Sequence, residues 1–219
     1  MYQWGRKDPI PGGDGDFDNR YRGIYQNTYN VRTGTSNNLE WFSIGTAIQS
    51  PYYMNFRYDA FWDWNPNYYS NLWNVSISIS DENMATTGYN YEQYKSIKTT
   101  KTIYDPSPVG FTLPNGEAYD GIAAQESGSY TYDSNARGYI YQSESGDMFI
   151  PCCGYRNTAV MGSDGSPYWY QTSGFTIWSS SPAHTHTSYM LWGDPNDGFY
   201  LRVSNSNRPY AIAVALIAE

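Results

Sequence analysis

The chain has 219 residues, is rich in Tyr (24) and Trp (8), and carries a formal net charge of −8 at pH 7. Domains of up to about 250 residues commonly keep one core, so we expect a single domain over residues 1–219, alone or as the C-terminal part of a longer protein. The charge argues against nucleic-acid binding, and no apolar run approaches the roughly 20 residues of a membrane-spanning helix, so we expect neither a nucleic-acid partner nor direct membrane insertion.

Three aspartates alternate near the N-terminus, at Asp14, Asp16 and Asp18. They resemble the first ligands of an EF-hand loop, but Asn19 stands where that loop needs a Gly, and Tyr25 where it needs a Glu. A looser calcium loop and a solvated acidic turn both stay open at this position. No other segment indicates a cofactor, and we expect none.

Two segments have the pattern of short helices. The first is Leu39 to Gln49, which ends at a Ser-Pro pair. The second is "NGEAYDGIAAQ", residues 115–125, with Asn115 as the N-cap and Glu117 in the first turn. Between them, "NVSISIS", residues 74–80, alternates polar and apolar side chains as a half-buried strand does, and it contains an Asn-Val-Ser sequon at Asn74.

The second half of the chain reads as a series of strands. The segments "GYIYQ", "DMFIP", "FTIWSS", "YMLWG", "FYLRV" and "YAIAVALIA" follow one another, separated by Gly, Asp, Asn, Ser and Pro. The last of them, Tyr210 to Ala218, is apolar on both faces, which predicts a central strand.

The residues that could carry chemistry do not form a catalytic or metal-binding pattern. Cys152 and Cys153 are adjacent, and their Cα separation of about 3.8 Å is below the usual disulfide span, so we expect two free thiols. His184 and His186 are the only histidines in the sequence. A metal site would need a third ligand, and a Ser-His-Asp hydrolase would need a Gly-x-Ser-x-Gly motif, which the sequence lacks. The sequence therefore predicts a protein that is not an enzyme.

Five segments stand out in order along the chain: "MYQWGRKDPIPG", "KTIYDPSPVGFTLPNGEAY", "FIPCCGYRNTAV", "GFTIWSSSPAHTHTSYMLW" and "NSNRPYAIAVALIAE". Together they resemble the Fibrobacter succinogenes major paralogous domains of Bacteroidetes surface and phage proteins. The chain departs from that family at Ser107 and Leu216, where the family carries cysteines, and at Ala215, where it carries Arg.

The resemblance implies an α+β class, with the C-type lectin fold of the formylglycine-generating-enzyme branch: a twisted antiparallel sheet, two helices and long ordered loops. That fold also houses the variable proteins of diversity-generating retroelements, in which residues near the C-terminus are rewritten to change the ligand. The same region of this chain is crowded with residue types of that kind, namely His184, Thr185, His186, Ser188, Tyr189, Asp194, Asn196, Asp197, Tyr200, Arg202, Ser204, Asn205 and Asn207.

We therefore expect a non-catalytic binding domain, extracellular on a bacterial surface or a phage virion, that recognises a cell-surface protein or glycan. The expected contact surface is the C-terminal residue set given above, with Tyr189 and Trp192 as aromatic anchors or, alternatively, as core residues. The expected framework comprises Trp178, Ser179, Ser180, Tyr155, Arg156, Arg208 and the last strand.

Two other functions stay open. A formylglycine-type or carbohydrate-active enzyme is disfavoured, because the former needs reactive cysteines late in the chain and none follows Cys153. A structural pilin or fibre module would instead bury the aromatic surface between sister chains, as a homo-oligomer.

Overall fold

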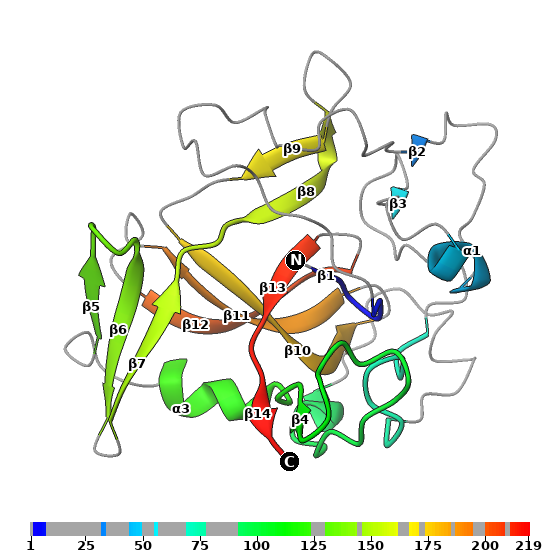
Figure 1. Ribbon diagram of the computed structural model, residues 1–219, viewed down its shortest axis with the longest axis horizontal. Coiled ribbons are helices and arrows are strands. Elements are labelled where there is room, and N and C mark those ends of the chain that lie inside the picture. The colour runs from blue at the N-terminus through cyan, green and yellow to red at the C-terminus, as the bar shows by residue number, and fades with distance from the viewer. Residues whose placement is uncertain are drawn as a thin grey trace.

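A computed structural model of the protein describes residues 2–7, 32–33, 44–49, 55–56, 69–77, 92–123, 130–143, 146–161, 167–170, 174–184, 187–194, 200–208 and 211–219. Its centre is a seven-stranded sheet (Figure 1). In spatial order this main sheet contains β12 (Tyr200–Asn207), β11 (Thr187–Asp194), β10 (Phe175–His184), β13 (Ala211–Val214), β8 (Tyr155–Met161) and β9 (Pro167–Tyr170), and β1 (Tyr2–Gln3) also pairs with β13. All pairs are antiparallel except β10 with β13, which are parallel.

Three smaller sheets and four short helical segments complete the described structure. The three-stranded sheet is β5 (Tyr130–Asp133), β6 (Gly138–Ser143) and β7 (Gly146–Pro151), and the two-stranded sheets are β14 (Ile217–Ala218) with β4 (Phe111–Thr112) and β2 (Arg32–Thr33) with β3 (Asn55–Phe56). The helical segments are α1 (Ile44–Gln49), η1 (Glu92–Tyr94), η2 (Glu117–Tyr119) and α3 (Asp120–Ala123). Among the described residues, no helix is long and apolar enough to cross a membrane.

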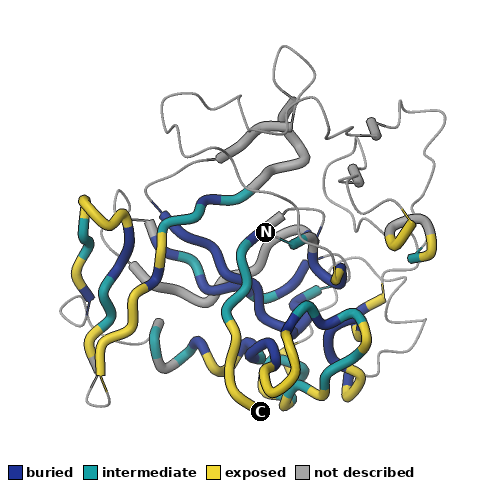
Figure 2. The backbone as a smooth tube through the Cα atoms, viewed as in Figure 1, coloured by how far each residue is buried: buried dark blue, intermediate teal, exposed yellow. Residues whose placement is uncertain are grey.

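The strands β10 and β11 bury side chains on both faces of the main sheet. On β10, Ile177 packs into one apolar cluster and the next residue, Trp178, packs into another. On β11, Leu191 belongs to the same cluster as Ile177, and Met190 belongs to the same cluster as Trp178. Because successive side chains of a strand point to opposite faces, the two clusters lie on opposite faces, and Figure 2 shows β10 as buried along its length.

Each cluster is completed by elements outside the main sheet. The Trp4 cluster consists of Trp4, Leu72, Trp73, Leu113, Trp178, Met190 and Ile212. The Tyr139 cluster consists of Tyr119, Tyr130, Tyr139, Ile150, Phe175, Ile177 and Leu191. The three-stranded sheet therefore packs on one face of the main sheet, and the N-terminal segment with residues 69–77 packs on the other.

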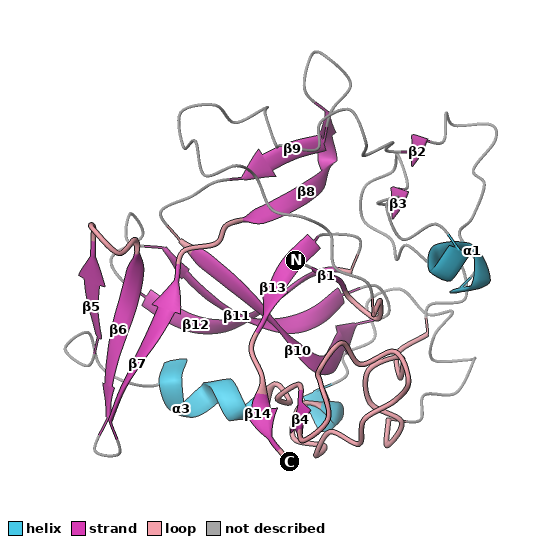
Figure 3. Cartoon of the chain, viewed as in Figure 1, coloured by secondary structure: helices cyan, strands magenta, loops and turns pink. Residues whose placement is uncertain are grey.

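The expected α+β class, a C-type lectin fold with two helices, is wrong. The described residues are mostly strands in small sheets, and they include no α-helix of seven residues or more (Figure 3). The two expected helices appear only as α1, six residues long, and as η2 followed by the four residues of α3. Helices this short gain little from intrinsic propensity and form only where they pack, whereas the aromatic side chains of this chain stabilise strands.

The predicted strands of the second half are confirmed as β6, β7, β10, β11 and β12. The last predicted strand, residues 210–218, is central only in its first part. β13 lies between β10 and β8, but the chain leaves the main sheet at Ala215, and β14 pairs instead with β4. The prediction of one continuous buried strand is wrong, because Leu216 lies exposed in the connection between the two strands and Ile217 lies exposed in β14.

The predicted strand at residues 74–80 is wrong over its described part. Asn74 forms a single bridge with Lys101, and Val75 and Ser76 form a turn. The Asn74 side chain explains this conformation, because its Oδ1 accepts hydrogen bonds from the amides of Ser76 (3.1 Å) and Thr100 (2.9 Å). Such Asn-to-backbone bonds compete with strand pairing.

Asn74 is fully buried, and its Nδ2 donates to the carbonyl oxygens of Ile97 (3.5 Å) and Lys98 (3.3 Å). The nitrogen that a glycan would occupy is therefore used inside the fold. Asn74 joins the turn at residues 74–76 to the segment at residues 97–100.

The second helical prediction is confirmed only in part at its start, because Gly116 occupies the N-cap position of η2 and Asn115, one residue earlier, supplies the side-chain hydrogen bond. The Oδ1 of Asn115 accepts a hydrogen bond from the amide of Ala118 at 3.0 Å, and Glu117 opens η2. This bond satisfies an amide that the first turn leaves without a helical partner.

Candidate binding site

A buried run of three serines shapes one end of β10. Trp178 pairs with Met190 and Pro182 pairs with Ser188, so three β10 residues, Ser179 to Ser181, stand opposite the single residue Tyr189. Such a β-bulge turns backbone and side-chain groups away from the regular ladder. The serines are therefore available to bind neighbouring segments.

The serine bulge attaches two segments that are distant in the sequence. Ser181 Oγ donates to the Lys95 carbonyl (3.2 Å) and accepts from the Gly116 amide (3.1 Å). Ser180 donates its amide to the Pro114 carbonyl (2.8 Å), and its Oγ lies 2.6 Å from Thr99 Oγ1. Residues 95–99 and 114–116 are thus held against β10.

Arg208, which directly follows β12, holds the ends of the neighbouring strands together. It is fully buried, and its guanidinium lies 4.5 Å from the centroid of the Trp4 ring. Its Nε donates to Ser188 Oγ (3.1 Å) on β11, and its Nη2 donates to Ser70 Oγ (3.0 Å) and to the His184 carbonyl (3.2 Å) on β10. One side chain therefore fixes β10 and β11 on both sides of residues 185–186.

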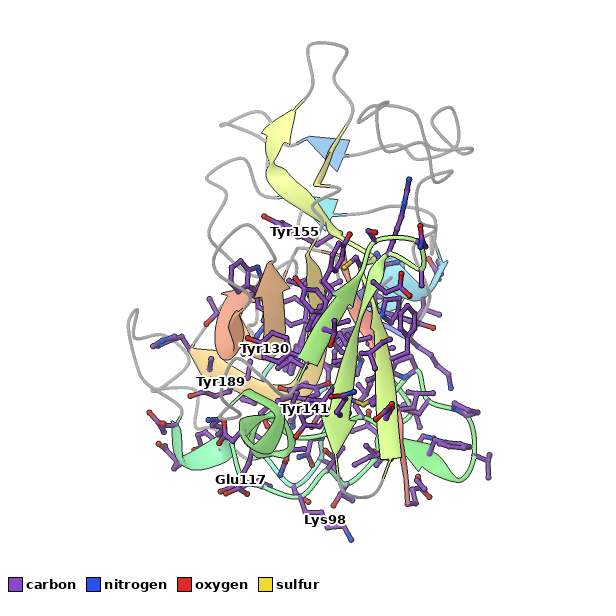
Figure 4. The ribbon with its side chains drawn as sticks, turned by 90° about the vertical axis from the view of Figure 1, so that its left-hand side faces the viewer. Lys98, Glu117, Tyr130, Tyr141, Tyr155 and Tyr189 are labelled. Atoms are coloured by element: carbon purple, nitrogen blue, oxygen red, sulfur yellow. The ribbon has the colours of Figure 1, made fainter. Side chains whose placement is uncertain are left out.

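Tyr189 lies half-buried on β11 beside this framework, near α3 (Figure 4). The Lys95 ammonium lies 5.7 Å from the centroid of its ring and forms hydrogen bonds of 2.6 and 2.8 Å with the two carboxylate oxygens of Asp120. The Lys95 side chain is 19% exposed and that of Asp120 is 46% exposed. We call Tyr189, Lys95 and Asp120 the Tyr189 site.

Gly116 lies against both Lys95 and Tyr189 in this site. A Cβ at this position would lie 2.9 Å from Lys95 Cγ and 3.2 Å from Tyr189 Cβ, closer than side chains normally pack. The backbone of Gly116 is in the ordinary right-handed helical region, with φ of −65°. The residue is therefore required here for space and not for backbone freedom.

Burial raises the pKa of the Tyr189 hydroxyl, and the carboxylates of Glu92 and Asp120 raise it further. Both effects oppose the formation of a phenolate. The hydroxyl therefore stays protonated in the field of these two carboxylates, next to the Lys95 ammonium.

The two predicted aromatic anchors lie on opposite faces of the main sheet. Tyr189 has the same strand parity as Leu191 and faces the side of the Tyr139 cluster, whereas Trp192 packs against the Trp4 cluster. Trp192 therefore packs against the core, which was the alternative to its expected role as a binding anchor. The side chain of Ser188 is fully buried and bound to Arg208, so it belongs to the framework.

The other predicted contact residues are placed only in part. His184 is half-buried at the end of β10. The backbone register sets positions 205 and 207 opposite Tyr189 and Thr187, and positions 200, 202 and 204 opposite Asp194, Trp192 and Met190. Thr185, His186, Asn196, Asp197 and the three aspartates Asp14, Asp16 and Asp18 lie outside the described residues.

The expected framework is confirmed for four buried residues, whereas Tyr155 is half-buried and the side chain of Arg156 lies outside the described residues. Trp178, Ser179 and Ser180 are fully buried, as is Arg208. The indole of Trp178 donates to the Tyr2 carbonyl (3.1 Å), and Ser179 Oγ donates to the Tyr189 carbonyl (2.9 Å). The latter bond fixes the backbone that carries the Tyr189 ring.

Sequence reasoning missed Lys95, Asp120 and Gly116. They lie more than 60 residues before Tyr189, in segments without a binding motif. The local sequence around these residues predicted only the start of a helix at Asn115. It did not predict a contact between this helix and β11. The serine bulge brings these segments together.

The two cysteines are free thiols, as expected. Both pack against the Tyr139 cluster, and burial raises the pKa of the Cys153 thiol, which disfavours the reactive thiolate. Among the residues that the structure describes, no group of three His, Cys, Asp or Glu side chains could hold a metal ion.

The stability of the fold is expected to fall as pH rises through about 10. Tyr119 is buried and donates its hydroxyl to the Trp178 carbonyl (3.0 Å), and burial raises its pKa above the ordinary value near 10. Below pH 10 the hydroxyl is protonated in both folded and unfolded chains. Above it, only the unfolded chain loses the proton readily, so unfolding becomes more favourable.

The measurement is the melting temperature between pH 8 and pH 11 for the wild type and for Tyr119→Phe. The variant should start lower, because it lacks the hydrogen bond, and should decline less steeply. Parallel curves for the two proteins would show that Tyr119 is not a source of the alkaline instability.

Comparisons of the chain with protein-family models, with curated proteins and with solved structures found no match.

Proposed function

We propose that the chain is a non-catalytic recognition domain that binds a cell-surface ligand through the end of the main sheet near Tyr189. The observation that carries the proposal is the combination of a rigid framework with a half-buried aromatic ring. Arg208 and the serine bulge fix the backbone on all sides of Tyr189, while the ring and the Asp120 carboxylate remain partly open to solvent. Preorganisation of this kind lowers the entropic cost of binding.

Several observations support recognition over catalysis. The free thiols are candidate nucleophiles, but the pKa of Cys153 is shifted in the direction that suppresses thiolate formation. The resemblance of five segments to the paralogous domains of bacterial surface and phage proteins agrees with an extracellular binding role. The β12 backbone pairs with β11 beside Tyr189 and borders the same sheet end.

Replacing Tyr189 with Ala is expected to weaken ligand binding by about 30-fold, which corresponds to the loss of about 2 kcal/mol that is typical of an interface hot spot. The assay is binding of the labelled domain to intact bacterial cells from a panel of strains. Phe111→Ala is the matched control, because Phe111 is an exposed aromatic residue on β4, in a different sheet. Equal binding by wild type and Tyr189→Ala would refute the placement of the contact surface.

A further inference from the structure

We infer that the Tyr189 site binds a neutral sugar, with the Tyr189 ring against the C–H face of the sugar and the Lys95–Asp120 ion pair bonded to two adjacent hydroxyls. This inference rests on the proposed function and specifies its ligand. The site combines one aromatic ring and one exposed ion pair, held together over Gly116. A pyranose ring offers the matching combination of an apolar face and a polar edge.

The hydrogen-bonding capacity of the ion pair fits adjacent hydroxyls. An ammonium has three N–H donors, and two of those of Lys95 are used by the oxygens of Asp120. A carboxylate accepts about four hydrogen bonds, of which Asp120 uses two for Lys95. The pair therefore keeps one donor and about two acceptor positions close together. Each hydroxyl of a vicinal diol can both donate and accept, so the two hydroxyls can bond to both partners.

The surrounding charge selects against acidic sugars. Besides Asp120, the carboxylate of Glu92 acts on the Tyr189 ring, and Glu117 lies exposed beside Gly116. Within the part of the chain that the structure describes, the cation paired in this group is Lys95, and Asp120 neutralises it. A sialic acid or a uronic acid would bring a further negative charge to the site, whereas a neutral hexose or N-acetylhexosamine would not.

The environment of Tyr189 suits a sugar better than a protein partner. Protein interfaces bury a central group of apolar side chains, whereas Tyr189 carries the Lys95 ammonium beside its ring and lies in the field of the Asp120 and Glu92 carboxylates. Exposed apolar side chains are instead found on other elements. They include Phe111 on β4 and Ile217 on β14, as well as Ile48, Val75, Ile103, Val109, Met148, Phe149 and Leu216. In small-molecule sites a few placed polar groups fix the orientation of the ligand, and Lys95 and Asp120 are such groups beside the Tyr189 ring.

The test uses an array of immobilised glycans that end in neutral hexoses or N-acetylhexosamines, together with their sialylated counterparts. The wild-type domain should bind a subset of the neutral glycans, and sialylation of the same terminus should weaken binding at least about tenfold. Asp120→Asn, which loses the charged acceptor, and Tyr189→Ala should each weaken binding at least about tenfold. Phe111→Ala should bind as the wild type does.

Gly116→Ala tests the geometry without removing any group of the site. The backbone accepts Ala, but its Cβ displaces Lys95 and Tyr189. We expect glycan binding to fall at least about fivefold, with retained secondary structure in circular dichroism. Retained binding to the array in Asp120→Asn and Gly116→Ala would overturn the assignment of the ion pair.

Cells treated with periodate, which cleaves vicinal diols, separate this inference from the proposed function. Loss of Tyr189-dependent binding to treated cells supports the sugar. Unchanged Tyr189-dependent binding to treated cells would overturn the sugar and leave a protein ligand, with the proposed function intact. Cell binding that never depends on Tyr189 would refute the proposed contact surface itself.

Discussion

Replacing Arg208 with Lys is expected to lower the free energy of unfolding by about 3 to 5 kcal/mol, although the charge is kept. Arg208 is fully buried and donates to Ser188 Oγ, Ser70 Oγ, the His184 carbonyl and the Tyr69 carbonyl (3.2 Å). A lysine ammonium is a compact charge that cannot reach these acceptors on three different segments. It would also lose the planar contact with the Trp4 ring.

Urea denaturation followed by Trp fluorescence measures this effect. Arg137→Lys is the control, because Arg137 lies exposed in the turn between β5 and β6, and its replacement should change stability by less than about 0.5 kcal/mol. The same loss in both variants would contradict the role of the buried guanidinium. Because Arg208 fixes the backbone on both sides of residues 185–186, Arg208→Lys should also weaken ligand binding under conditions in which it remains folded.

Replacing Asn74 with Ala is expected to cost about 2 to 4 kcal/mol. The side chain satisfies the amides of Ser76 and Thr100 and the carbonyls of Ile97 and Lys98. Removing the amide group leaves these backbone atoms without their partner inside the fold, and each unsatisfied buried group costs about 1 to 3 kcal/mol, partly recovered where water can enter.

Asn71→Ala serves as the control for this prediction, since Asn71 lies exposed three residues earlier. Thermal unfolding should place Asn74→Ala well below the wild type and Asn71→Ala close to it. A second variant, Asn74→Asp, keeps the acceptor but loses both donors and buries a charge, so it should be no more stable than Asn74→Ala. A stable Asn74→Asp protein would argue against the burial of this side chain.

The loss of Asn74 should also affect the Tyr189 site. Asn74 holds the carbonyls of Ile97 and Lys98, two and three residues after Lys95, and Lys95 is itself bound to Ser181 through its carbonyl. The position of the Lys95 ammonium therefore depends on a side chain in the turn at residues 74–76.

Local patterns in the sequence predicted the strands β6, β7, β10, β11 and β12 and the side-chain hydrogen bond of Asn115 at the start of η2, because these features depend on alternation and on contacts a few residues apart. The adjacency of Cys152 and Cys153 similarly predicted free thiols. The framework role expected for Ser179 and Ser180 came from the resemblance of their segment to the paralogous domains, and not from a local pattern.

The tertiary structure alone decided which of these segments meet. The expected helices shortened, and the last strand divided between two sheets, because packing overrides the weak local preference of short apolar segments. Tyr189 and Trp192 are both aromatic and only three residues apart, yet the alternation of side chains along β11 places them on opposite faces of the main sheet. Lys95 and Asp120 lie beside Tyr189 because the bulge in β10 directs Ser180 and Ser181 toward segments that are distant in the sequence. Contacts between residues so far apart leave no periodic pattern in a single sequence.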